Sequence, residues 1–167
     1  MGANPASVLT RDDLALLDDA RRGVLATIAR DGRPRLVPVC FVAGPGAGAS
    51  AAIYLPLDEK PKRPADVRQL ARVRDILERP RAALLVDRWD EDWSRLAWLR
   101  LEGTVALVEP GRDTAAEHAG AVAALRERYP QYATQRLEAN PLMRLRVERV
   151  VRWAAASAAA TTRPART

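Results

Sequence analysis

The feature that most restricts the fold of this chain is a hairpin pattern at residues 23–42. Two runs rich in β-forming residues flank Asp31-Gly32, a dipeptide that accepts the positive φ angles of a tight hairpin turn. The second run is apolar on both faces. Leu36, Pro38, Cys40 and Val42 point one way, and Val37, Val39 and Phe41 point the other. Because a strand half-exposed to water alternates polar and apolar residues, we expect this one to be covered twice, by the core and by a second body.

Pro38 restricts where this strand can lie. Proline cannot donate to a β ladder, so it belongs on an edge strand, at a bulge, or where another body approaches the backbone. An apolar edge strand needs a cover, which could be a second subunit or a flat ligand. An ordinary core strand with a bulge is the alternative that the residues alone leave open.

Length and composition predict one domain. The chain has 167 residues, enough for a sizeable core, and we expect a flexible arm at 1–9, a domain at 10–153 and a disordered tail at 154–167. No apolar run approaches the roughly 20 residues of a membrane span, and no signal-peptide pattern opens the chain. The lone Cys40 cannot form an internal disulfide, so a cytoplasmic location is expected.

The formal charge of +6 favours an anionic partner, which could be nucleic acid, a membrane surface or a phosphorylated or polycarboxylate small molecule. The tryptophans lie beside Asp and Glu in the segment 89–93, not within a basic strand, and this pattern argues against nucleic acid.

The periodicity predicts an antiparallel, mainly β domain with peripheral helices. Helices are expected at 11–21, 65–77 and 114–128, the first opened by a capping box of Thr10 and Asp13. Further strands are expected at 51–57, 81–87, 95–108 and 142–153, six strands in all, with Gly103 marking a bulge or bend. The inward residues predicted for the last strand are Met143, Leu145, Val147, Val151 and Trp153. Short hairpin connections favour a barrel over a βαβ sheet.

Catalytic groups are scarce. With one His and one Cys on different elements, neither a hydrolytic triad nor a zinc site is expected, and His118 is predicted to be a surface or packing residue. Such a protein could bind a cofactor that brings its own chemistry. A flat ring would lie on the backbone of Val37 to Phe41. Cations for its phosphate could come from Lys60, Lys62, Arg63, Arg72 and Arg74, although solvated surface charges remain the alternative.

Several segments together resemble one family. They are the opener at 23–41, Asp-Glu-Lys-Pro-Lys-Arg (58–63), Arg-Val-Arg-Asp-Ile (72–76), Leu-Leu-Val-Asp-Arg-Trp-Asp-Glu-Asp-Trp (84–93) and Trp-Leu-Arg-Leu-Glu-Gly-Thr (98–104). In this order and spacing, they resemble the pyridoxamine-phosphate-oxidase-like, flavin-binding split-barrel family, and within it the coenzyme F420-dependent (deazaflavin) branch. The resemblance covers about Thr10 to Trp153.

The resemblance implies a homodimer of six-stranded split barrels with two cofactor sites at the subunit interface. It places the ring along Val37, Pro38, Val39 and Cys40, and the phosphate at Lys60, Lys62, Arg63, Arg72 and Arg74. Trp93, Trp98 and Arg100 would contribute from the facing subunit. The family often has Asn at the position of Asp75, where a carboxylate beside a phosphate is unfavourable.

The cofactor is expected to be F420, with flavin mononucleotide (FMN) as the alternative. F420 carries a phosphodiester and a polyglutamate tail, which suit the basic segment at 60–63. The leading hypothesis is an oxidoreductase that passes hydride between the reduced deazaflavin and a small organic acceptor. A binding protein that carries the cofactor without turnover is equally compatible with the scarcity of catalytic groups, and no residue is assigned as catalytic.

Overall fold

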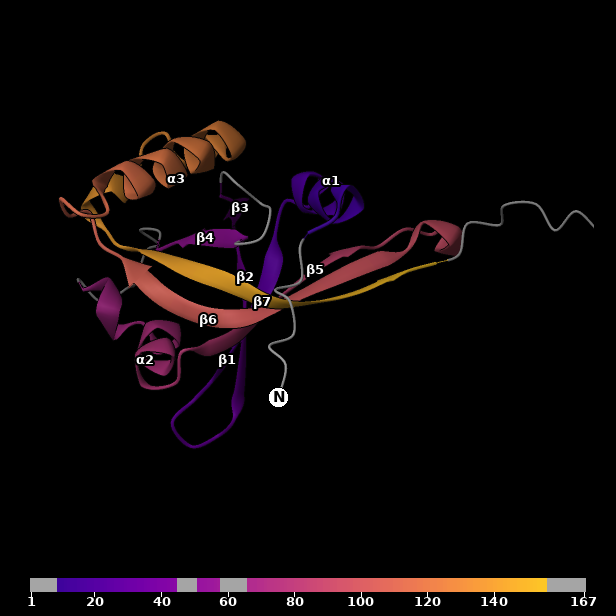
Figure 1. Ribbon diagram of the computed structural model, residues 1–167, viewed down its shortest axis with the longest axis horizontal. Coiled ribbons are helices and arrows are strands. Elements are labelled where there is room, and N and C mark those ends of the chain that lie inside the picture. The colour runs from indigo at the N-terminus through magenta and orange to yellow at the C-terminus, as the bar shows by residue number, and fades with distance from the viewer. Residues whose placement is uncertain (1–8, 45–50, 58–65, 156–167) are drawn as a thin grey trace, which may run out of the picture.

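The computed structural model describes residues 9–44, 51–57 and 66–155. Their strands form one antiparallel sheet of seven strands in the order β2-β1-β5-β6-β7-β4-β3 (Figure 1). The strands are β1 (Gly23–Ile28), β2 (Pro34–Val39), β3 (Val42–Ala43), β4 (Ala52–Pro56), β5 (Arg81–Arg88), β6 (Ala97–Val108) and β7 (Leu142–Ala154). The helices are α1 (Arg11–Asp19), α2 (Ala71–Glu78) and α3 (Ala115–Arg128), with 3-10 turns η1 (Val67–Gln69), η2 (Trp93–Arg95), η3 (Pro130–Tyr132) and η4 (Leu137–Ala139).

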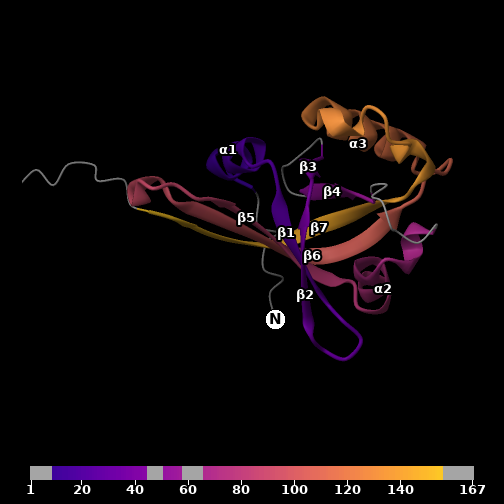
Figure 2. The same cartoon turned by 180° about the vertical axis from the view of Figure 1, so that it is seen from behind.

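The sheet is curled into a half-barrel by its connectivity. Its two edge strands, β2 and β3, are consecutive in the chain and are separated only by Cys40 and Phe41. A flat sheet of this order could not bring its edges within two residues of each other, so the sheet bends until they meet (Figures 1 and 2). The antiparallel barrel with peripheral helices predicted from the sequence is confirmed, although there are seven strands and not six. The apolar run at 36–42, which the sequence predicts as one strand, is divided between the two edge strands β2 and β3.

A tyrosine holds the junction of the two edges. The hydroxyl of Tyr129, at the end of α3, donates to the carbonyl of Phe41 (2.8 Å) and accepts from its N–H (3.1 Å). Phe41 is fully buried. The backbone groups that leave the ladder between β2 and β3 are therefore satisfied by a side chain, as buried polar groups must be.

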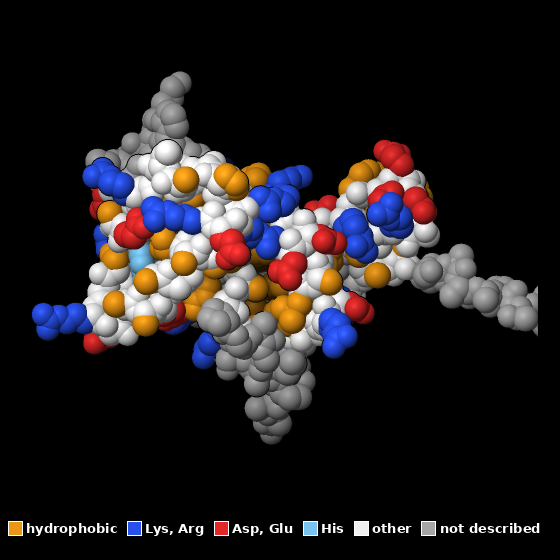
Figure 3. All heavy atoms as spheres, turned by 90° about the horizontal axis from the view of Figure 1, so that it is seen from above, with side chains coloured by type: hydrophobic (Ala, Val, Ile, Leu, Met, Phe, Trp, Pro, Cys, Tyr) orange, Lys and Arg blue, Asp and Glu red, His pale blue; other side chains and the backbone are white. Residues whose placement is uncertain are grey.

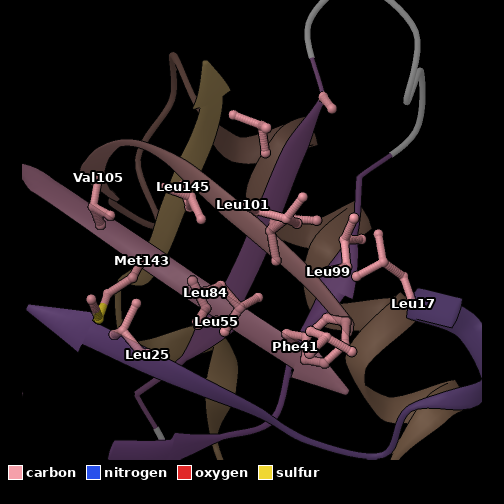
Figure 4. Close-up of a cluster of buried hydrophobic side chains, with 14 of the residues drawn as sticks. Leu17, Leu25, Phe41, Leu55, Leu84, Leu99, Leu101, Val105, Met143 and Leu145 are labelled. Atoms are coloured by element: carbon pink, nitrogen blue, oxygen red, sulfur yellow. The ribbon is translucent and has the colours of Figure 1, made fainter. Parts of the chain in front are cut away.

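The main core lies inside the curl. Leucines from β1, β5 and β6, among them Leu25, Leu84 and Leu101, meet Met143 of β7 there (Figure 4). Leu17 of α1 and Ile76 of α2 belong to the same cluster. The predicted capping box of α1 is confirmed, with Thr10 and Asp13 each accepting a bond from the other's backbone N–H. No helix among the described residues is long and apolar enough to cross a membrane.

A second, smaller core lies on the outer side of the sheet, beneath α3. Its members include Leu125 of α3 and Tyr54 of β4. Ile53, the neighbour of Tyr54, lies in the main core, as expected because successive strand residues point to opposite faces. α3 thus covers the outer side of β3, β4 and the adjoining ends of β6 and β7.

The predicted bulge at Gly103 is confirmed, and it corrects the predicted faces of β7. Glu102 is opposite Arg149 and Gly103 is opposite Val147, so Glu148 is an extra residue in β7. One inserted residue reverses the alternation beyond it. Met143, Leu145 and Val147 are buried as predicted. The inward placement of Val151 and Trp153 was wrong, since they stand opposite Arg100 and Trp98 on the outer face.

Candidate functional site

One part of the sheet's outer face carries apolar side chains and no helix of the described residues. The register aligns these side chains across β2, β1, β5, β6 and β7. This surface, the open face, consists of Val24, Ala26, Leu36, Pro38, Ala83, Leu85, Trp98, Arg100, Val151 and Trp153. Leu36 is 66% exposed and Trp153 is 47% exposed. Large apolar side chains in contiguous exposed positions are typical of a binding surface.

The centre of the open face is hollowed. A depression of about 470 Å³ lies over β1, β2, β5 and β6, with walls that include Leu36, Leu85 and Trp98. Asp87 and Arg100 line it as well. The Nε of Arg100 donates to Glu102 (2.7 Å), which also binds Arg149 (3.0 Å). Burial raises the pKa of Glu102, but the bonds from Arg149 and Arg100 outweigh it and hold that pKa below its usual value. The lining of the depression is thus mostly apolar, with the charged side chains of Asp87 and Arg100 in it, whereas Glu102 and Arg149 lie outside that lining.

The strand β2 forms one side of this depression and is an edge of the sheet. The placement of Pro38 on an edge strand is confirmed. Leu36 and Pro38 point to the open face, whereas Val37 and Val39 point the other way and are half-buried. The edge of β2 that does not pair with β1 is free to meet a ligand or another chain, as far as the described residues go.

A second depression, of about 430 Å³, lies between the β1–β2 turn and α2. We call it the arginine groove, and it is lined by Arg30, Arg33, Arg35 and Arg74 together with Ala29, Asp31, Asp75 and Glu78. Arg33 pairs with Asp31 (2.7 Å), Arg35 with Asp75 (2.7 Å), and Arg30 more loosely with Glu78 (3.9 Å). Within the described part of the chain, no carboxylate pairs with Arg74. The groove can therefore attract an anion.

Asp75 is buried, with only 6% of its surface exposed. Its Oδ2 accepts a bond from the hydroxyl of Thr27 (2.8 Å) and one from the Nε of Arg35 (2.7 Å). Thr27 and Arg35 are cross-strand partners in β1 and β2, so one carboxylate oxygen connects α2 to two strands. The carboxylate that appeared unfavourable beside a phosphate is compensated by an arginine.

The structure separates the residues predicted to hold the ring. Val37, Pro38 and Val39 lie in β2, but Cys40 lies beyond its end, half-buried and packed against the cluster beneath α3. Trp98 and Arg100 lie beside Leu36 on the open face. Trp93 lies apart from them in η2, 70% exposed, at the tip of the arm that β5, β6 and β7 extend beyond the barrel (Figure 1). Figure 3 shows acidic and basic side chains intermingled on that arm.

The predicted phosphate cations are also divided. Lys60, Lys62 and Arg63 lie outside the described residues. Arg74 is exposed and lines the arginine groove, whereas Arg72 is buried at 8% exposure. The helix predicted at 65–77 is broken at Leu70, whose extended backbone separates η1 from α2. Arg68, in η1, does not line the groove and instead binds Glu109 (2.8 Å).

Sequence reasoning missed Arg35 and Arg33 as candidate residues. The signal that could have found them is the register set by the Asp31-Gly32 turn, which places Arg35 opposite Thr27. Their nearness to Arg74 could not be read from that register, because it depends on how α2 packs against β1.

The remaining ionisable groups have structural partners. His118 is buried and its Nε2 contacts the carbonyl of Asn140 (2.8 Å), so the prediction of a packing histidine is confirmed. Burial and a hydrogen bond to Glu117 raise the pKa of Tyr54 to about 12. Burial also raises the pKa of Glu117, but bonds from Tyr54 and Arg144 outweigh it and keep that pKa below its usual value. The described residues contain no cluster of His, Cys, Asp and Glu that could hold a metal ion.

Comparisons with known proteins agree with this fold. The family model for pyridoxamine 5′-phosphate oxidase matches residues 9–154. A conserved hypothetical protein from Mycobacterium tuberculosis is similar in structure, with a TM-score of 0.66 at 20% identity over 94% of this chain and 92% of the other. An FAD-binding protein from Mesorhizobium loti gives 0.60 at 18% identity over 85% and 92%. A heme storage protein from Vibrio cholerae gives 0.60 at 13% identity over 89% and 95%. No curated protein matches the sequence significantly.

Proposed function

The chain belongs to the pyridoxamine 5′-phosphate oxidase family, and from that premise we propose that it is a coenzyme F420-dependent oxidoreductase. When bound, the reduced deazaflavin would supply hydride to a small organic acceptor. The observation that carries the proposal is the combination of an apolar depression with an arginine-lined one at the same unpaired edge strand. Arg35 and Leu36 point to opposite faces of β2, so a planar ring with an anionic tail would reach both surfaces across the unpaired edge of that strand.

The residues around β2 suit such a ligand in type. The backbone of Val37, Pro38, Val39 and Cys40 would lie along the ring. Arg74 would meet the phosphate from the groove, together with Arg72 and the basic segment that contains Lys60, Lys62 and Arg63. Each charge-assisted bond to phosphate contributes on the order of 1.5–3 kcal/mol. We assign no proton donor, so the protein's part is to bind, orient and keep water away.

A second copy of the chain would complete the site. The open face includes Leu36 and Trp153, which are too exposed for a stable monomer surface of this continuity. A homodimer formed through this face would bury them and enclose the depression beside β2. Trp93, Trp98 and Arg100 of the second copy would then reach the cofactor. The exposed Trp93 at the tip of the arm suits contact with another subunit.

FMN is the alternative cofactor, and the similarity to an FAD-binding protein favours a flavin of some kind. A non-catalytic carrier of F420 or flavin is the alternative role. The similarity to a heme storage protein supports it, because that protein stores a ligand on the same fold.

Tryptophan fluorescence can test binding. We expect saturable quenching by F420, weaker quenching by FMN, and none by single-stranded DNA at two salt concentrations. Trp98→Phe should remove most of the quenching, whereas Trp89→Phe, at a 70% exposed position, should leave it. Consumption of reduced F420 with a panel of quinones and activated enones then separates an enzyme from a carrier. A protein that stays monomeric and binds neither cofactor would contradict the proposal.

A further inference from the structure

The arginine groove contains a carboxylate whose position gives it a specific effect on anions. Asp75 comes from α2, is almost fully buried, and accepts the Nε–H of Arg35 at 2.7 Å. The bond from the Thr27 hydroxyl at 2.8 Å fixes the same oxygen. The carboxylate therefore cannot move away when a ligand enters, and it holds the guanidinium of Arg35 in one orientation.

Arg35 retains the donors that a ligand would use. Only its Nε–H is bound to Asp75, and the N–H donors of its two terminal nitrogens bind no acceptor among the described residues. Its side chain is 38% exposed, against 7% for Asp75. A ligand in the groove can therefore reach Arg35 while the carboxylate stays behind it, shielded from solvent.

The charges of the groove are nearly balanced by this arrangement. The pairs Arg35–Asp75 and Arg33–Asp31 are each close to neutral, Arg30 lies near Glu78, and Arg74 has no carboxylate partner in the described residues. The described lining of the groove therefore offers many N–H donors but only one arginine in excess of its carboxylates, whereas Lys60, Lys62 and Arg63 lie outside the described residues. Excess positive charge in a site strengthens the binding of a doubly charged anion more than that of a singly charged one. A site with N–H donors but little excess charge therefore favours the singly charged anion.

We propose that Asp75 is a positioning residue that makes the arginine groove selective for a monoanionic phosphodiester over a dianionic phosphate monoester. This inference rests on the proposed function, since F420 carries a diester and FMN a monoester. Asp75 orients Arg35 toward the phosphate and cancels the charge that would otherwise favour the monoester.

The magnitude follows from Coulomb's law. One additional positive charge about 4 Å from the ligand, in surroundings as polar as water, strengthens binding about fivefold for a monoanion and about twenty-five-fold for a dianion. Removing the charge of Asp75 should therefore shift the preference toward a monoester by about fivefold. Asn is the suitable replacement, because its side-chain oxygen can still accept the bonds from Thr27 and Arg35.

The experiment compares Asp75→Asn with the wild-type protein, and with Glu78→Gln as the matched control. Glu78 lines the same groove but pairs with Arg30 only at 3.9 Å and is half-exposed. Riboflavin lacks the phosphate that FMN carries, so the Kd of riboflavin divided by the Kd of FMN measures the contribution of the monoester phosphate to binding. The Kd of F420 is measured in the same experiment. We expect Asp75→Asn to raise the riboflavin-to-FMN ratio at least tenfold and to tighten F420 binding about fivefold. Glu78→Gln should change either value less than threefold.

A probe that requires no cofactor separates this inference from the proposed function. Inorganic phosphate at pH 8, against chloride at equal ionic strength, should raise the melting temperature of Asp75→Asn more than that of the wild type. Arg35→Gln, introduced into either the wild type or Asp75→Asn, should abolish the difference between the melting temperatures in phosphate and in chloride. If neither cofactor binds but phosphate behaves in this way, the proposed function fails and the effect of Asp75 on the groove stands. Equal ratios and equal phosphate responses in Asp75→Asn and wild type would overturn the inference.

Discussion

Gly103 of β6 lies directly against the carbonyl oxygen of Arg146 in β7, so that a Cβ atom built on the glycine would stand 1.9 Å from that oxygen. The contact occurs where Glu148 is inserted into β7 and the two longest strands bend together. Because the obstacle is backbone in the centre of the sheet, it cannot move aside without breaking the ladder.

Gly103→Ala is therefore expected to destabilise the protein by about 3 kcal/mol or more. Gly120→Ala is the matched control, because Gly120 lies exposed in α3 with nothing near its missing Cβ. That substitution should stabilise the protein by about 0.5–1 kcal/mol through helix propensity. Urea unfolding of both variants measures the two free energies, and a Gly103→Ala protein of wild-type stability would contradict the bulge geometry.

Leu36→Asp should weaken the proposed homodimer, because it places a charge on the apolar open face. Leu77→Asp is the control: Leu77 is 61% exposed, close to the 66% of Leu36, but it lies on α2 and away from the open face. Light scattering over a range of concentrations should show Leu36→Asp dissociating at concentrations at least tenfold higher than wild type, while Leu77→Asp remains dimeric. Equal dissociation of the two variants would mean that the open face is not the interface.

Asp13 should contribute a pH-dependent part of the stability. Its carboxylate accepts two bonds from Arg152 (2.9 and 2.8 Å) and one from the backbone of Thr10 (2.8 Å). Burial raises the pKa of Asp13, but these bonds outweigh it and lower that pKa below its ordinary value of 3.8. The unfolded chain therefore binds the proton more readily, so the stabilisation is complete above the ordinary pKa and is lost as pH falls through the lowered one.

At pH 7, Asp13→Asn should lower the free energy of unfolding by about 1.5–3 kcal/mol, the range for hydrogen bonds to charged groups. Below about pH 4 the difference from wild type should begin to shrink, because the unfolded wild-type chain then takes up the proton, and it should vanish once pH falls below the lowered pKa of the folded carboxyl. Asp12→Asn, an exposed neighbour in the same helical turn, controls for charge near the start of α1. A difference that stays constant from pH 7 to pH 2.5 would show that the Arg152 bonds are not responsible.

The basic segment before α2 should carry part of the affinity for the cofactor. Lys60→Ala and Arg63→Ala should each weaken F420 binding about tenfold or more, the equivalent of one lost charge-assisted bond to phosphate. Arg112→Ala removes an exposed charge from the β6–α3 connection and should leave the Kd within twofold. Isothermal titration calorimetry measures all three, and unchanged affinity in both variants of the basic segment would remove it from the phosphate site.

Local patterns predicted much of the fold. The Asp31-Gly32 turn, the capping box of Thr10 and Asp13, and the bulge at Gly103 were each identified from a few neighbouring residues, and each is confirmed. These features depend on backbone conformations that only certain residues adopt readily. The edge position of Pro38 was predictable for the same reason, since its ring removes the donor that an inner strand needs.

Other features arise only when distant segments meet. Glu148 reverses the faces of Val151 and Trp153, and the alternating sequence does not show which residue is inserted, because that depends on the pairing of β6 with β7. Likewise, the run at 36–42 looks like one strand in the sequence, but it is divided into β2 and β3 at Phe41. The backbone of Phe41 is bound there by Tyr129, which is 88 residues away in the chain.

The sequence by itself determined the turns, the caps and a strand that could not be an inner one, because these depend on the chemistry of adjacent residues. Only the tertiary structure decided what surrounds that strand. The curl of the sheet leaves Leu36 and Trp98 together on an open face, and the packing of α2 brings Asp75 to Arg35. Both depend on the relative positions of elements about 40–60 residues apart, which short-range periodicity does not encode.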